Sequence, residues 1–414
     1  MRNVWILTAV IVFFGFVNGL LINVTPQDAL ALGFSSADIG KVGFGLPLGY
    51  AASCLLLWRL SGRLRGKHVL LCGILGALAA MVLMALGRTV SVCTAAQVLF
   101  GLASGAFWPF ASAWLLEFQS EGLGKPRLLR HYNVGWTSGS STGLFLAGVL
   151  CRNGLIQETL YGGAAVLAAV FVAASCARAK DDAPPPAPSR EGRGNTNGPP
   201  PARAGGTPAL PRGSTSAIGL PLLVAAASVN MAALGTRAII VCNYPELNEK
   251  LGFQADRMGI LTALMLLSQL AAFGLGSVYE PWLGLRRLYV FMAGALLAIN
   301  LAFGCTSSLA ILVPAVLLQG LVLAVAFQTG MFAATSYFSV PRTGTTFHEA
   351  TVGLAGVTML GAGQVVAYLE GAGIGPISAL RAPFLLMCGV IVLLLALQLV
   401  LVSLRGHQRI LWPS

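Results

Sequence analysis

The sequence predicts an all-α membrane protein with twelve transmembrane helices in two pseudo-symmetric six-helix bundles. Composition is the first of three observations behind this prediction: of 414 residues, 56% are hydrophobic and only 10% are charged, whereas soluble domains carry about 25% charged residues. The mean hydropathy of +0.78 is typical of a polytopic membrane protein. The other two observations are a series of twelve apolar segments and an internal repeat that relates the two halves of the chain.

Each apolar segment is close to the length that a membrane-spanning helix needs, which is about 20 mainly apolar residues. The expected spans are 4–24, 39–58, 69–87, 91–116, 133–151, 159–177, 217–242, 258–279, 288–305, 309–334, 350–371 and 380–404. Their Gly, Ala and Ser residues allow neighbouring membrane helices to approach closely. The first run is too long for a secretory signal, and another span follows it directly, so we expect it to be retained as the first helix.

Between the sixth and seventh spans the composition changes completely. Residues 178–216 are dominated by Pro and Gly and contain almost no large apolar side chain. Such a segment cannot bury enough surface to offset the entropy lost on ordering, and we expect a disordered cytoplasmic linker. A ligand for a proline-binding module is the alternative. The predicted domains are therefore an N-terminal bundle at 1–177, the linker at 178–216 and a C-terminal bundle at 217–414.

The position of the positive charges predicts orientation. The net charge is +12, and most Lys and Arg residues fall on one side of the predicted spans, as in the 59–68 loop with Arg59, Arg63, Arg65 and Lys67. The positive-inside rule then places both termini in the cytoplasm. We expect a multi-pass protein of the plasma membrane, or of the inner membrane if the source is bacterial. Because the charge is explained by orientation, nucleic acid is not an expected partner.

The two halves of the chain repeat each other in register. The tripeptide LGF at Leu32–Phe34 recurs at Leu251–Phe253, an offset of 219 positions (251 minus 32). The same offset pairs Gly101 with Gly320 and Lys67 with Arg286. A nearly constant register across five helices indicates two duplicated six-helix halves, an arrangement in which a substrate binds between the halves near the middle of the membrane.

The fourth segment carries the clearest family resemblance. It reads QVLFGLASGAFWP, with Gln97, Gly101, Gly105 and Pro109 at four-residue spacing. This resembles the Arg-x-x-x-Gly-x-x-x-Gly-x-x-x-Pro pattern of major facilitator superfamily transporters, and the chain is similar to that family over its whole length outside the linker. We assign no subfamily. Glycines four residues apart lie on one helix face and permit close packing. Gln97 stands where the family often has an arginine linked to proton coupling, so we expect a pH gradient to have little effect on transport.

A second resemblance lies between the second and third spans. The family loop there is similar to Gly-x-x-x-Asp-Arg-x-Gly-Arg-Lys, and this chain keeps Arg63 and Lys67 but has Gly62 in place of the aspartate. The resemblance implies a gating loop on the cytoplasmic side, with Arg286 and Arg287 as its counterparts in the second half.

Without the aspartate, this loop needs an acidic partner. The candidates are Glu117, Glu349 and lipid phosphate groups, since anionic headgroups attract such cations by roughly 1 kcal/mol each. The alternative is that the basic residues serve only to set topology.

The fifth segment repeats the glycine spacing. Gly135, Gly139 and Gly143 form a second four-spaced face that predicts close helix packing. Family antiporters carry a Gly-Pro pair in this helix. Here Gly143 is followed by Leu144, which argues against antiport.

Polar side chains inside the membrane are costly, so each one is a candidate functional residue. In the resembling family, helices 1, 4, 7 and 10 line the central path. The expected substrate-binding residues, on these and neighbouring helices, are Asn18, Trp108, Asn230, Arg237, Gln269 and Gln328. Arg237 is the most specific, because a permanent cation can recognise a carboxylate or phosphate with paired hydrogen bonds. The alternatives are that it snorkels outward or pairs with Asp28, Asp38 or Glu370.

The remaining sequence gives little support for other chemistry. The carboxylates Asp38, Glu117, Glu349 and Glu370 all fall near predicted helix ends, which argues against a proton relay at mid-membrane. The eight cysteines form no C-x-x-C pair and no His-Cys cluster, so no metal site and no cofactor are expected. There is no nucleotide-binding loop and no nucleophile motif, so we expect no catalytic residues and no enzyme.

The expected function is secondary active or facilitative transport of a small organic solute by alternating access between the two halves. The alternative is a membrane sensor or assembly protein that resembles transporters but does not transport. The expected partners are a small-molecule solute, with an anion as the favoured type, a coupling ion as an option, and membrane lipids. We expect a monomer.

Overall fold

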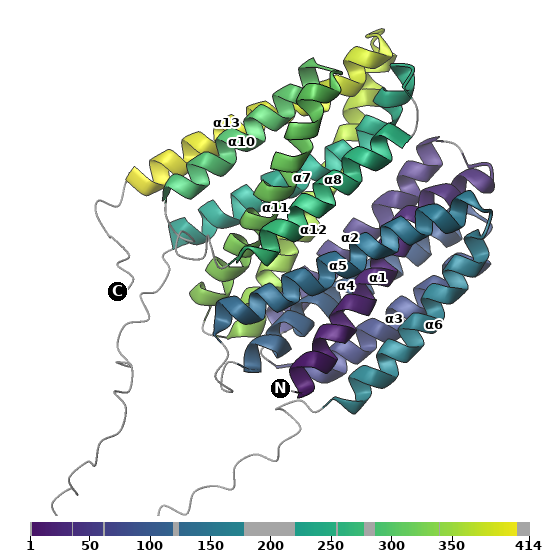
Figure 1. Ribbon diagram of the computed structural model, residues 1–414, viewed down its shortest axis with the longest axis vertical. Coiled ribbons are helices and arrows are strands. Elements are labelled where there is room, and N and C mark those ends of the chain that lie inside the picture. The colour runs from purple at the N-terminus through teal and green to yellow at the C-terminus, as the bar shows by residue number, and fades with distance from the viewer. Residues whose placement is uncertain are drawn as a thin grey trace, which may run out of the picture.

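The computed structural model describes residues 2–34, 36–60, 63–118, 124–177, 220–253, 256–276, 286–338 and 340–403. The predicted linker at 178–216 lies outside these residues. The described chain is all-α, and its helices form two bundles that lie side by side (Figure 1).

Within the described residues, the N-terminal bundle contains six helices, one for each predicted span. They are α1 (Arg2–Ala31), α2 (Ser36–Leu60), α3 (Gly66–Leu86), α4 (Val90–Glu117), α5 (Lys125–Arg152) and α6 (Ile156–Cys176). Within the bundle α1 packs against α5 and α6, α2 packs against α4, and α3 packs against both α4 and α6.

The C-terminal bundle repeats this arrangement. Its helices are α7 (Leu220–Lys250), α8 (Asp256–Gly274), α10 (Arg286–Cys305), α11 (Leu309–Tyr337), α12 (Pro341–Gly371) and α13 (Pro376–Ser403). Here α7 packs against α12 and α13, α8 against α11, and α10 against α11 and α13. The same five pairings occur in the first bundle, and α7 in addition packs against α11 more extensively than α1 packs against α4. The twelve-helix, two-bundle fold that the sequence predicted is therefore confirmed.

Ten of the described helices are long and apolar enough to cross a membrane by length and composition. The other two are α8, whose apolar stretch is shorter, at Ile260–Gly274, and α5. Both occupy bundle positions equivalent to those of apolar helices, because α5 packs on α1 as α12 packs on α7, and α8 packs on α11 as α2 packs on α4.

The four-spaced glycines lie where helices meet most closely. A Cβ atom on Gly101 of α4 would collide with the Leu46 carbonyl oxygen of α2, and one on Gly139 of α5 would collide with the Val12 carbonyl oxygen of α1. Gly143 meets the Phe16 carbonyl in the same way. Gly135 differs, because a Cβ there would meet only side chains, the nearest at 3.3 Å.

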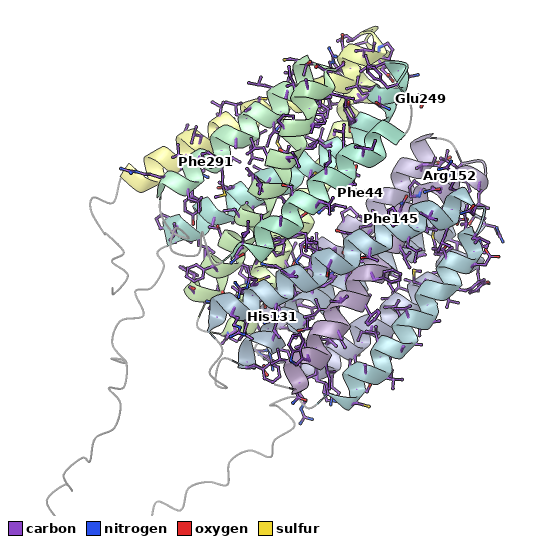
Figure 2. All side chains as sticks on the ribbon, viewed as in Figure 1. Phe44, His131, Phe145, Arg152, Glu249 and Phe291 are labelled. Atoms are coloured by element: carbon purple, nitrogen blue, oxygen red, sulfur yellow. The ribbon has the colours of Figure 1, made fainter. Side chains whose placement is uncertain are left out.

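The two bundles contact each other mainly through α12. This helix packs against both α2 and α4 of the N-terminal bundle, and α5 packs against α8. The contacts between bundles described below lie toward the end of the molecule at which α1, α5 and α12 begin, and we call it the closed end. Arg152 and Glu249, at the far ends of α5 and α7, lie at the opposite end (Figure 2).

Candidate functional site

The backbones of α12 and α2 approach closely at two glycines. A Cβ atom on Gly353 would lie 2.7 Å from Ala51 Cα, and one on Gly356 would lie 2.6 Å from Pro47 Cβ. Distances this short leave no room for a side chain. The middle of α12 is therefore fitted tightly against the middle of α2.

A buried carboxyl group lies one turn closer to the closed end. The Tyr50 hydroxyl of α2 lies 2.6 Å from Glu349 Oε2, and the Tyr132 hydroxyl of α5 lies 3.0 Å from Glu349 Oε1. Glu349 and Tyr132 are each 2% exposed and Tyr50 is 7% exposed. We call these three residues the Glu349 cluster. It joins three helices and both bundles through hydrogen bonds alone, without a cation.

The position of Glu349 corrects the sequence-based expectation. The eleventh span was predicted to begin at 350, which placed Glu349 at a helix end. In the structure α12 begins at Pro341, so Glu349 lies about two turns inside the helix. The preceding turns are polar, but their threonines are satisfied within the protein: Thr346 Oγ1 lies 2.7 Å from the Arg342 carbonyl oxygen. A carboxyl group does lie inside the helical bundle.

A second polar contact between the bundles lies at the start of α12. Arg342 Nη2 forms an ion pair with Glu117 Oε1 of α4 at 2.9 Å, and Arg342 Nη1 donates to the Leu64 carbonyl oxygen at 3.1 Å. The Arg342 and Glu117 side chains are 19% and 22% exposed. Arg342 therefore links the C-terminal bundle to both α4 and the loop between α2 and α3.

This contact differs from the predicted gating residues. In the loop, Arg63 is exposed and Lys67 is half-buried, and on α10 Arg287 is exposed. The side chain of Arg286 lies outside the described residues. Glu117 was one of three candidate partners of the loop cations, with Glu349 and lipid phosphate. The structure pairs Glu117 with Arg342, a residue that sequence reasoning missed. Arg342 lies in the first turn of α12. The hydropathy pattern predicted that this helix begins at residue 350, so Arg342 was not considered as part of it.

Two more hydrogen bonds cross between the bundles at the closed end. Thr345 Oγ1 donates to the Pro109 carbonyl oxygen at 2.9 Å, and Lys125 Nζ donates to Ser336 Oγ at 2.8 Å. Pro109 belongs to the predicted packing motif of α4, so that motif also contacts the opposite bundle. Gln97, the first residue of the motif, donates to Thr25 Oγ1 of α1 at 2.6 Å and stays within its own bundle.

Aromatic rings fill the space between the bundles beside the Glu349 cluster. The ring of Trp136 lies 6.1 Å from that of Phe273 and 5.5 Å from that of Phe327, both in the C-terminal bundle. Trp108, a predicted substrate residue, lies 5.2 Å from Phe14 and is 7% exposed. Packing accounts for its position, because it is surrounded by rings of its own bundle.

One face of α7 carries Asn230 and Arg237. Seven residues apart on a helix, their side chains leave the axis in nearly the same direction. The other faces of α7 are occupied: Gly235 meets Thr358 of α12 and Met387 of α13, and Thr236 accepts a hydrogen bond from Asn300 of α10. Asn230 itself lies beside α11, because its Cβ atom is 3.4 Å from the Cβ position of Gly330.

The polar groups on this face have no partner among the described residues. Asn230 is fully buried, and neither its amide oxygen nor its nitrogen has a hydrogen-bond partner there. Arg237 is half-buried and forms no ion pair within the described chain. Asp38, one of its expected alternatives, pairs instead with Lys41 at 2.8 Å.

The other predicted substrate residues are spread over the molecule. Gln269 and Gln328 are fully buried in the C-terminal bundle, and Asn18 is half-buried on α1. The Gln269 amide has no hydrogen-bond partner among the described residues, and Gln328 lies 3.4 Å from the Cβ position of Gly276.

Residues 6–238, more than half of the chain, match the family model for the major facilitator superfamily. The chain therefore belongs to this superfamily and is a multi-pass membrane transporter. The match favours transport over the alternative of a non-transporting sensor or assembly protein. No curated protein sequence matches the chain.

Solved structures share the whole fold. The human organic anion transporter MFSD10 (TETRAN) is similar at a TM-score of 0.67 and 16% identity, covering 96% of this chain and 99% of that one. The nucleoside transporter NupG has a TM-score of 0.63 and 14% identity, with 97% and 100% coverage. The transporter FucP in its outward conformation has a TM-score of 0.63 and 12% identity, with 95% and 98% coverage.

Proposed function

We propose that the protein transports a small organic anion and that Arg237 contacts the anion. The single observation that carries this proposal is the half-buried guanidinium group of Arg237 on α7, which has no ionic partner among the described residues. A permanent cation inside a membrane protein is costly unless it meets an anion or water. A planar guanidinium group matches a carboxylate or phosphate with two parallel hydrogen bonds. The human structural neighbour is named as an organic anion transporter, but at 16% identity the proposal rests on Arg237.

Asn230 supplies neutral donors and acceptors on the same face. It lies about two turns from Arg237, toward the closed end, and is turned the same way. An anion held by Arg237 would direct its remaining polar groups along α7 toward this amide. We propose Arg237 for charge recognition and Asn230 for orientation of the solute.

We further propose that both termini lie in the cytoplasm, in the plasma membrane. This orientation follows from the positive-inside rule. The closed end, at which α1 begins, then faces the cytoplasm. With the bundles joined there, this conformation would take up or release solute on the opposite side, and the other half of the cycle requires the α12 contacts to separate.

The experiment is uptake into proteoliposomes with a panel of organic anions, a neutral sugar and a nucleoside. We expect one anion class to be transported. Arg237→Gln should abolish uptake of that anion, and Arg237→Lys should retain a fraction, because it keeps the charge but not the planar donor pair. Arg152→Gln, an exposed arginine at the end of α5, is the matched control. Full anion uptake by Arg237→Gln, or transport of the neutral solutes alone, would contradict the proposal.

A further inference from the structure

The Glu349 cluster contains a carboxyl group that the transport proposal does not use. We infer that Glu349 is a proton-binding site, protonated when the bundles are joined at the closed end and deprotonated when they separate there. This inference rests on the alternating movement in the proposed function, but it does not depend on the identity of the solute.

The geometry of the cluster makes the site dependent on conformation. Glu349 belongs to the C-terminal bundle, whereas both of its hydrogen-bond partners, Tyr50 and Tyr132, belong to the N-terminal bundle. Separation of the bundles at this end therefore removes both phenol groups together. Water from that side replaces them, because the Arg342 and Thr345 contacts that cover the cluster must break in the same movement.

The charge balance around Glu349 favours the neutral acid in the joined state. Burial of an ionised carboxylate is costly unless a cation or several hydrogen bonds compensate it. The titratable groups that face Glu349 are Tyr50 and Cys54 on α2 and Tyr132 on α5, and all three are neutral in their ordinary forms. Two phenol groups are the only compensation that the described residues offer.

The remaining helices around α12 supply no charge to the carboxyl group. The adjacent His348 is turned to α11, where its ring lies 4.5 Å from that of Phe327. On α4, Glu117 is held by Arg342 at the start of α12. The described parts of α7, α11 and α13 place no ionised side chain against Glu349. A neutral carboxyl group fits this site, because its O–H can donate to one phenol oxygen while its other oxygen accepts from the second phenol.

The direction of the pH effect follows from linkage. If the joined state binds one proton that the separated state releases, lower pH favours the joined state and higher pH favours separation. For one proton, the equilibrium constant between the two states changes by at most about tenfold per pH unit. This inference therefore predicts a pH dependence, whereas the sequence, through Gln97, predicts little effect of a pH gradient on transport.

The test measures the distance between the bundles at the closed end in the full-length protein, without any solute. Probes are introduced through noncanonical amino acids at the exposed positions Arg59 of α2 and Val290 of α10, which avoids the native cysteines. Lowering the pH from about 8 to about 6 should raise the joined fraction, with a slope of up to about tenfold per unit. Glu349→Gln should remain joined and show no pH response.

Two further variants and a matched control complete the experiment. Glu349→Asp keeps a titratable group and should restore a pH response, and the Tyr50→Phe, Tyr132→Phe double variant should lower the joined fraction at every pH. Glu370→Gln removes an exposed carboxylate from the other end of the same helix and should behave as wild type. A wild-type distance distribution that does not change with pH would overturn the inference, as would an unchanged pH response in Glu349→Gln. Neither result depends on transport, so failure to find a transported anion would leave this test intact.

Discussion

Arg342 joins the two bundles at the closed end, beside a loop that lacks the family aspartate. Its guanidinium group reaches Glu117 on one side and the Leu64 carbonyl oxygen on the other, so one residue of the C-terminal bundle holds two segments of the N-terminal bundle. Gly66 allows this approach, because a Cβ atom there would lie 3.1 Å from the guanidinium carbon. The loop between α2 and α3 therefore takes part in this contact through its backbone.

Arg342→Gln should weaken the joined state without unfolding the protein. The ion pair is partly exposed, so its loss together with the hydrogen bond to Leu64 should cost about 1 kcal/mol, roughly a fivefold shift toward the separated state. The distance measurement at Arg59 and Val290 detects this shift. Arg63→Gln, at an exposed loop position, should produce none. A larger shift in Arg63→Gln than in Arg342→Gln would indicate that the loop cations, and not Arg342, hold the bundles together at this end.

The residue scale also shows what the sequence could not reveal. Glu349 lies 299 positions from Tyr50 and 217 from Tyr132. No local pattern reports contacts between positions so far apart. Arg237, in contrast, was predicted as a candidate from the cost of a cation in an apolar segment, and the structure adds that the described chain offers it no anion. Its role remains a prediction.

At the scale of elements, α12 carries most of the contact between bundles. It supplies Arg342, Thr345, Glu349, Gly353 and Gly356, at intervals of three or four residues. Such spacing places all five on one face of the helix. The hydropathy pattern predicted this helix but began it nine residues late, because its first turns are polar. The turns that the prediction left out contain Arg342, Thr345 and Glu349, which contact the N-terminal bundle at the closed end. The late predicted start of the helix therefore also hid these contact residues.

Gly353→Ala should shift the protein toward the separated state. The added methyl group would lie 2.7 Å from Ala51 Cα, which is backbone and cannot move aside cheaply. Overpacking of this kind typically costs about 1–3 kcal/mol. The same distance measurement should show a smaller joined fraction. Gly361→Ala on the same helix, where nothing lies within 4 Å of the new Cβ, should match wild type. A joined fraction in Gly353→Ala equal to that of wild type would mean that the bundles are not held at this glycine.

At the scale of the whole molecule, the sequence predicted the fold well, since hydropathy, charge and repetition are distributed over hundreds of residues. The twelve helices within the described residues, their division into two bundles and their equivalence all agree with the prediction. The conformation could not be predicted in this way, because a transporter must be compatible with more than one arrangement of its bundles. The internal repeat of the sequence is compatible with each of these arrangements, so it does not indicate which one the protein adopts.

The native cysteines allow the proposed orientation to be tested. Cys176 ends α6 near the closed end, Cys305 ends α10 at the opposite end, and both are exposed. A membrane-impermeant maleimide added to intact cells should label Cys305 and not Cys176, and permeabilisation should add labelling of Cys176. The Cys176→Ser and Cys305→Ser variants assign the two signals. Labelling of Cys176 alone in intact cells would reverse the orientation.

The close contact of Gly353 with Ala51 divides α12 into two unequal lever arms. Gly353 lies 12 residues from Pro341 and 18 residues from Gly371, which corresponds to arms of about 18 Å and 27 Å. If α12 rocks on this point as a rigid rod, each ångström of travel at the Arg342 end becomes about 1.5 Å at the far end. Breaking a few short-range contacts on the short arm is then enough to produce a larger displacement on the long arm.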